Sequence, residues 1–148
     1  MALTFETEIE RLLYEILTGD DELTSLLGAG GTDPRIYLPW RAEDRPRISD
    51  SEPGYVVIRF DSASQPHRLS ETVDDRRERY YLSLFSMPEA GELRGGVVMR
   101  FRALFHRRSF VTESFLVYET VEIGREERAT DDRLVEHMYI LSIGFLPR

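Results

Sequence analysis

The sequence contains no cysteine and no lysine among its 148 residues. Without cysteine, the chain can form no disulfide framework, no cysteine-ligated zinc site, no thiol nucleophile and no iron–sulfur cluster. Without lysine, it lacks the phosphate-loop lysine of P-loop NTPases, the strand lysine of protein kinases and any Schiff base with pyridoxal phosphate. These two absences exclude several large classes of enzyme, and they make every one of the 19 basic residues an arginine.

Long apolar runs are missing as well. No stretch approaches the roughly 20 apolar residues that a membrane-spanning helix needs, and the acidic, amphipathic start differs from a basic secretory signal peptide. We therefore expect a soluble protein that is not exported by that route. The net charge is −8, with most of the excess acid in residues 1–30. Binding to nucleic acid depends mainly on cationic groups that displace counterions, so specific DNA binding is not expected.

Two amphipathic helices are expected before any strand. Residues 4–18 place apolar side chains at helical spacing, and Gly19 can end this helix. Asp20 can cap a second, short helix that stops at the glycine-rich residues 28–31. That segment lacks the preceding strand and the following lysine of a phosphate-binding loop, so we interpret it as a helix-terminating linker.

The rest of the chain is predicted to form strands and one further helix. Apolar patterns predict strands at 35–38, 54–61, 71–86, 110–123 and 134–146, a helix from Pro88 to about residue 105, and exposed loops at about 41–53, 62–70 and 124–133. The last two strands are expected to form one long hairpin. The order α-α-β-β-β-α-β-β shows no regular βαβ alternation. We therefore expect residues 1–148 to form a single domain of α+β fold with a largely antiparallel, mixed sheet.

No catalytic or metal-binding motif is recognisable. The three histidines come from a loop, a helix end and a strand, and none has the i, i+4 spacing of a helical metal pair. We expect His106 to interact with the helix dipole and solvent, and His137 to lie on a strand surface. The nucleophile motif Gly-x-Ser-x-Gly is absent. The sequence therefore predicts a protein without enzymatic activity, cofactor or metal.

Charged residues are concentrated in three segments, at about 41–47, 74–79 and 125–132. The acidic pairs Asp74-Asp75 and Asp131-Asp132 could act in acid–base chemistry or bind magnesium. Interleaved arginines are more typical of a solvated ion-paired surface or of a subunit interface, and both interpretations stay open for residues 74–79. The candidate subunit or partner interface comprises Asp74, Asp75, Arg76, Arg77, Glu78, Arg79, Arg41, Arg45, Arg47, Arg125 and Arg128.

The order of short motifs resembles the tail terminator, or tail completion, proteins of long-tailed bacteriophages and related phage-like elements. The matching features are Gly19 to Leu27 after the first helix, Arg35-Ile36-Tyr37 with its nearby prolines, Pro53 to Ile58, a helix of the Ala90 to Phe105 kind, and Asp131-Asp132 before His137 to Ile140. The resemblance covers nearly the whole chain. The sequence departs from the pattern through its longer 41–53 loop and its charged 71–79 extension.

This resemblance implies a structural virion protein of α+β fold that forms a hexameric ring at the tail–head junction. Such a ring is assembled in the host cytoplasm, caps the head-proximal end of the tail tube and contacts the tube protein and the head connector. DNA passes through it without specific binding. A ring requires two different surfaces that meet head to tail, for which we expect the 71–79 extension on one side and 41–53 or 124–133 on the other.

Other functions fit the sequence as well. A head-completion or stopper protein, another component of the neck, would share the ring symmetry but bind the portal side. A small α+β enzyme would need a ligand-sized pocket with convergent polar groups. A homodimeric binding module would show twofold symmetry.

Overall fold

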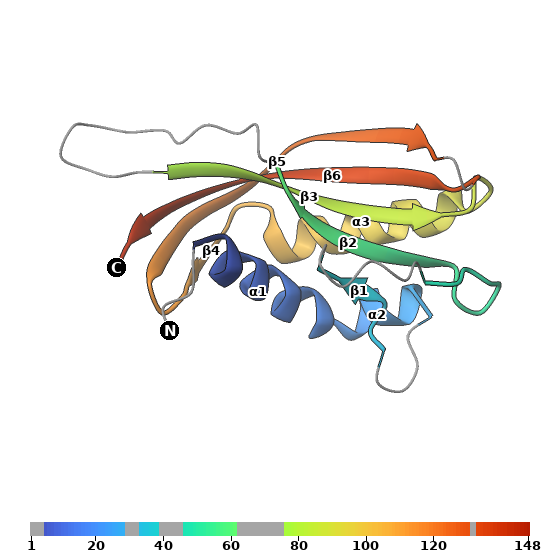
Figure 1. Cartoon of the computed structure of the whole chain (residues 1–148), viewed down its shortest axis with the longest axis horizontal. Helices are drawn as coiled ribbons and strands as arrows, with labels where there is room; N and C mark the ends of the chain where they lie inside the picture. The colour runs from blue at the N-terminus through green and yellow to red at the C-terminus, as the bar shows by residue number, and fades with distance from the viewer. Residues whose placement is uncertain (1–4, 29–32, 39–45, 62–75, 131–132) are drawn as a thin grey trace.

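The fold is a curled six-stranded sheet with all three helices on one of its faces (Figure 1). The computed structural model describes residues 5–28, 33–38, 46–61, 76–130 and 133–148. Its elements are α1 (Phe5–Thr18), α2 (Asp21–Leu26), β1 (Ile36–Tyr37), β2 (Gly54–Phe60), β3 (Arg76–Ser86), α3 (Gly91–Phe105), β4 (Arg108–Val111), β5 (Phe115–Ala129) and β6 (Val135–Pro147). The expected loop at 62–70 lies outside the described residues.

The strands follow the order β1-β2-β3-β6-β5-β4 across the sheet. The short β1 pairs in parallel with β2, and the other four pairings are antiparallel. This confirms the predicted α+β class with a largely antiparallel, mixed sheet.

The last third of the chain differs from the predicted two-stranded hairpin. Residues 110–123 do not form one strand, because the chain reverses at 112–114 between β4 and β5. The charged residues after Gly124 are not a loop up to Arg133, because β5 continues to Ala129 and pairs with β6 as far as Val135. Pairing with a neighbouring strand thus overrides the polar composition of this segment, as is common for β structure.

The start of the third helix also differs from the prediction. The helix begins at Gly91, and Pro88 lies in the turn before it. Arg94 explains this start, because its guanidinium donates to the carbonyls of Met87 (2.9 Å) and Pro88 (2.9 Å) and so binds the turn to the first helical turn.

The main core lies between the helices and the sheet. Alternate strand residues point to this helix face. The buried side chains of this core include Ile9, Leu13 and Leu17 of α1, Val97, Phe101 and Phe105 of α3, and Val56, Ile58, Tyr80, Leu82, Leu84, Tyr139, Leu141, Ile143 and Phe145 of the sheet. A smaller cluster of Tyr55, Val57 and Phe85 lies on the opposite side, which we call the outer face; Tyr37, Ile48 and Leu134 pack against it. Both faces of the sheet are therefore partly covered.

An ion pair joins the second helix to the third. Asp20 caps α2 as predicted, because its Oδ2 accepts the Leu23 N–H at 3.1 Å. Arg100 of α3 donates to both carboxylate oxygens of Asp20, at 2.9 and 2.8 Å. The Arg100 hydrogen bond holds the pKa of the Asp20 carboxyl below its usual value, although burial opposes this shift. The charged form of Asp20 therefore stabilises the folded chain.

Asp20→Asn is expected to lower the free energy of unfolding by about 2 kcal/mol at pH 7, since it removes charge-assisted hydrogen bonds. Because the pKa of Asp20 is lower in the folded chain, this stabilisation is present above the unfolded-state pKa and is lost as the pH falls through the folded-state value. Urea unfolding at pH 7 and in acid should show the difference between variant and parent shrinking in acid. Asp21→Asn, at an exposed neighbour, is the control, and an equal loss at both pH values would contradict the mechanism.

Candidate functional site

The predicted interface residues are only partly within the described structure. Asp74, Asp75, Arg41 and Arg45 lie outside it, and Arg76 is described by its backbone alone. The remaining candidates are Arg47, Arg77, Glu78, Arg79, Arg125 and Arg128, and they do not form one cluster. Arg77, Glu78 and Arg79 lie on β3, Arg125 and Arg128 lie on β5, and Arg47 lies in the segment before β2.

Arg77 is engaged within its own sheet. Its guanidinium forms an ion pair with Glu119 of β5, donates to the Ser142 Oγ of β6 at 3.2 Å, and lies 5.9 Å from the ring centroid of Tyr118. The Tyr118 ring in turn covers Gly144, where an added Cβ would come within 2.6 Å of it. These contacts tie three neighbouring strands together on the outer face.

Its two neighbours on β3 differ from each other. Glu78 is buried, with 7% of its surface exposed, whereas Arg79 is exposed. Alternation along the strand explains this, since successive side chains point to opposite faces. Residues 77 and 79 therefore share the outer face, and the charged run is not one uniform surface.

Arg128 lies near the other end of β5 and contacts a buried carboxylate. Its Nε donates to Glu136 Oε1 at 2.7 Å, and an Nη of Arg59 lies 3.4 Å from Glu136 Oε2. Glu136 is only 1% exposed, whereas the side chains of Arg59 and Arg128 are 39% and 60% exposed. Arg59 also stacks over the ring of Phe85, with its guanidinium carbon 5.5 Å from the centroid. We call Arg59, Arg128 and Glu136 the arginine pair site.

The remaining β5 candidate, Arg125, belongs to a different group. Its Nε lies 3.5 Å from Glu122 Oε1. The Glu122 carboxylate also accepts two hydrogen bonds from Arg102 of α3, at 2.6 and 3.0 Å. The Arg102 hydrogen bonds are the main cause of the lowered pKa of Glu122. Arg125 therefore adds to an ion cluster between β5 and α3 and not to the arginine pair site.

The structure separates the predicted interface into two ends of the outer face. Glu119, the partner of Arg77, lies nine positions before Arg128 on β5, which corresponds to about 30 Å of strand. By contrast, Ile48 and Leu134 pack against the same outer cluster, so the described part of the 41–53 loop lies beside the turn that follows β5. Ile48, from the first alternative for the second side of the interface (41–53), therefore lies on the same surface as Leu134, which directly follows the other alternative (124–133).

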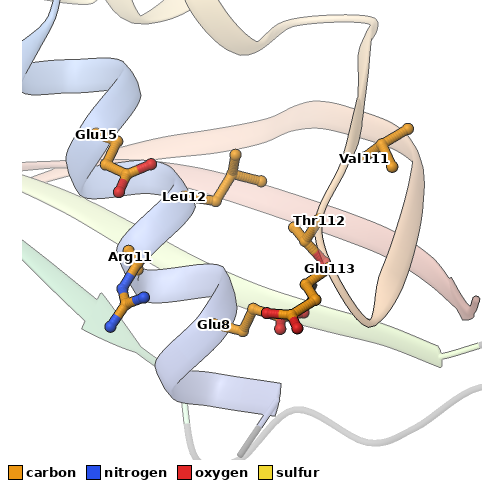
Figure 2. A pocket seen from close by; sticks show the side chains of 7 residues that line it. All are labelled: Glu8, Arg11, Leu12, Glu15, Val111, Thr112 and Glu113. Carbon is orange, nitrogen blue, oxygen red and sulfur yellow. Dashed lines mark hydrogen bonds between the residues drawn. The ribbon is translucent and has the colours of Figure 1, made fainter. Parts of the chain in front are cut away.

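A polar hollow of about 260 Å³ lies between α1 and the β4–β5 turn, and sequence reasoning missed it. It is lined by Glu8, Arg11, Leu12 and Glu15 of α1 and by Val111, Thr112 and Glu113 of the turn (Figure 2). Glu8 is 8% exposed, and its Oε2 accepts hydrogen bonds from the Thr112 Oγ1 at 2.6 Å and from the Ser114 N–H at 3.3 Å. We call these seven lining residues the acidic hollow.

Charge in the acidic hollow is unbalanced. Its lining holds three carboxylates, from Glu8, Glu15 and Glu113, and one guanidinium, that of Arg11. None of these four forms an ion pair with another residue in the described ranges. Glu15 and Glu113 are exposed, so the hollow offers negative charge to a cationic group from outside the chain.

One of the two histidine predictions is wrong, since His106 lies at the end of α3 as expected and His137 does not lie on the surface. His106 Nδ1 accepts the Glu122 N–H at 3.2 Å. His137 is buried on the helix face, with 7% exposure, so a strand-surface position was wrong. Its Nδ1 lies 2.7 Å from Glu127 Oε1, and this hydrogen bond is the main cause of the lowered pKa of Glu127.

The described ranges hold no group of three histidine or acidic residues placed to bind a metal ion. Within the same ranges, no helix is both long and apolar enough to span a bilayer. The arrangement supplies fixed charges of both signs at separate places, which is suited to contacts with charged surfaces of other proteins.

Comparison with known proteins finds similarity in structure alone. No family model matches the chain, and no curated protein matches its sequence. A chain of the structure described as "Virion of native gene transfer agent (GTA) particle" superimposes with a TM-score of 0.69 at 11% identity. The two chains share a fold. The match covers 99% of this chain and 100% of that one. A second solved chain gives a TM-score of 0.49 at 9% identity over 97% of this chain and 92% of its own.

Proposed function

We propose that this chain is a structural subunit of a phage-like particle, and that it acts as a tail terminator: a hexameric ring on the head-proximal end of the tail tube that joins the tube to the head connector. The observation that carries the proposal is the full-length match to a chain of a gene transfer agent virion, which covers 100% of that chain. Because neither chain has a large unmatched part, the comparison also supports treating residues 1–148 as one domain.

The charged surfaces are consistent with a role in assembly. The exposed guanidinium groups of Arg59 and Arg128 and the exposed carboxylates of Glu15 and Glu113 are available to neighbouring subunits or to the tube and connector proteins. Electrostatic complementarity of this kind favours correct partners and correct register more than it adds affinity. The net charge of −8 fits a ring through which DNA passes without binding.

The proposal predicts a specific effect on tube assembly. The purified chain should be added to the tube-forming protein of the same particle, and the products imaged by negative-stain electron microscopy, with tube protein alone as the control. We expect rings at one end of each tube and tubes of limited length, because a bound ring removes the surface on which the next tube ring would add. Light scattering should give a mass six times that of the chain.

Other outcomes would change the conclusion. Binding to purified heads or their connector, with no binding to tubes, would identify a stopper or another neck protein. A stable dimer that ignores both tubes and heads would contradict a role in the virion and favour a homodimeric binding module.

A further inference from the structure

The two ends of β5 carry fixed charges of opposite sign. The acidic hollow lies beside Glu113, just before the strand begins, and the arginine pair site lies at Arg128, near its end. The strand crosses the long dimension of the molecule in Figure 1, from the β4 side to the far end. Fifteen positions separate these two residues, or roughly 50 Å of extended strand, so the two sites cannot meet within one chain.

The arginine pair site is pre-organised to bind an anionic group. The carboxylate of Glu136 is 99% buried and draws both guanidinium groups to one place, and the ring of Phe85 orients Arg59. Each guanidinium carries five N–H donors in a planar fork. One nitrogen of each contacts Glu136, and the two side chains are 39% and 60% exposed, so their outward donors can reach a further group. Two cations on one buried anion give these three groups a net charge of +1.

The acidic hollow supplies the complementary group. Glu15 and Glu113 are exposed at its rim, and Glu8 is fixed by Thr112. Val111, which is 60% exposed, adds apolar surface to the same wall. A mixed surface with carboxylates around an apolar side chain is suited to bidentate pairing with arginine, which combines a planar charge with an apolar stem.

We propose that the acidic hollow of one copy binds the arginine pair site of the next copy, head to tail. The binding partner is a second copy because the chain carries both an anionic site, the acidic hollow, and a cationic site, the arginine pair site. These two sites lie at opposite ends of β5. Contact between two different surfaces is heterologous, and its repetition gives a closed ring when the rotation between copies divides a full turn. The inference rests on the proposed ring and assigns the two surfaces that build it.

The first test reverses charge at the hollow. In the hollow variant, the double substitution Glu15→Arg and Glu113→Arg places cations where the arginine pair site would bind. The control is the double substitution Glu89→Arg and Glu92→Arg, which changes the charge equally at two exposed carboxylates elsewhere. Mass photometry over a concentration series should show the ring for the parent and the control, and at least a tenfold higher assembly midpoint for the hollow variant. Thermal unfolding of each variant establishes that the subunit is folded.

The second test establishes that the two surfaces touch each other. Arg128→Gln keeps a hydrogen-bond donor near Glu136 but removes one charge, and it should also weaken the ring. The hollow variant keeps an intact arginine pair site, and Arg128→Gln keeps an intact hollow. In a mixture of the two, these intact surfaces can bind each other, but the remaining surfaces are both altered. Assembly should therefore stop at pairs that contain one copy of each variant. Rings of the hollow variant at the parental midpoint, or a mixture without such pairs, would overturn the assignment while the ring itself stands. A parent chain that never assembles and ignores tubes would refute the proposed function as well.

Discussion

Gly28→Ala is expected to lower the free energy of unfolding by about 3 kcal/mol. Gly28 follows α2 with a φ of +78°, a conformation that a side chain disfavours. A Cβ at this position would lie 2.0 Å from the Ser51 carbonyl oxygen and 2.8 Å from the Glu52 Cα. Both atoms belong to backbone, so the clash cannot be relieved by turning a side chain. The segment 46–53 must move or the end of α2 must unwind.

Urea unfolding with a matched control checks this result. Gly95 lies inside α3 with no described atom within 4 Å of an added Cβ, so Gly95→Ala should be neutral or stabilising by up to about 1 kcal/mol through helix propensity. The Gly28 variant should also change the environment of Ile48, which segment 46–53 places on the outer face. Parental stability for the Gly28 variant would show that the linker and this segment are not in the described contact.

Local patterns were sufficient to predict most of the elements. Helical spacing located α1, alternation located β2, and Asp20 caps its helix as expected. These features depend on neighbours within a few residues of one another. The α+β class followed from the order of the elements, because no regular βαβ alternation is present.

The extent of β5 could not be predicted in the same way. Its charged end is a strand because β6 pairs with it as far as Ala129, and that pairing is decided by tertiary structure. Register shifts after Val117 and after Glu122 also change which side chains share a face, so simple alternation fails along this strand. His137 is a different case: it has the same parity as the buried Tyr139, which was a usable signal for its burial.

The candidate surfaces depend on pairs that are far apart in the sequence. Glu8 meets Thr112 across 104 positions, and Arg59 meets Glu136 across 77. No short motif records such contacts. The interleaved charges in the sequence correctly predicted arginine–carboxylate pairing in the charged segments. They did not show that Arg77 and Arg128, which we assigned to a candidate interface, each have a carboxylate partner inside their own sheet.

Arg35→Met is expected to lower the free energy of unfolding by about 3 kcal/mol, because it removes a buried guanidinium that donates to three acceptors, two of them backbone carbonyls. Arg35 is 3% exposed and lies just before β1. Its Nε donates to the Gly54 carbonyl at 2.9 Å, and its two Nη atoms donate to the Glu52 carboxylate at 3.1 Å and to the Arg47 carbonyl at 2.9 Å. Methionine fills similar space but leaves two backbone carbonyls without these donors.

Two further variants separate the geometry of the guanidinium from its charge. Arg35→Lys keeps the charge, but a single ammonium cannot reach three acceptors set around a planar fork, so most of the loss should remain. Arg47→Met is the control, since that side chain is exposed and only its carbonyl accepts from Arg35; its effect should stay within about 0.5 kcal/mol. Urea unfolding gives the stabilities, and amide exchange at Val56, whose N–H donates to the Arg35 carbonyl at 3.0 Å, reports the β1–β2 contact directly. Full stability in Arg35→Lys would mean that charge alone holds segment 46–53 against the sheet.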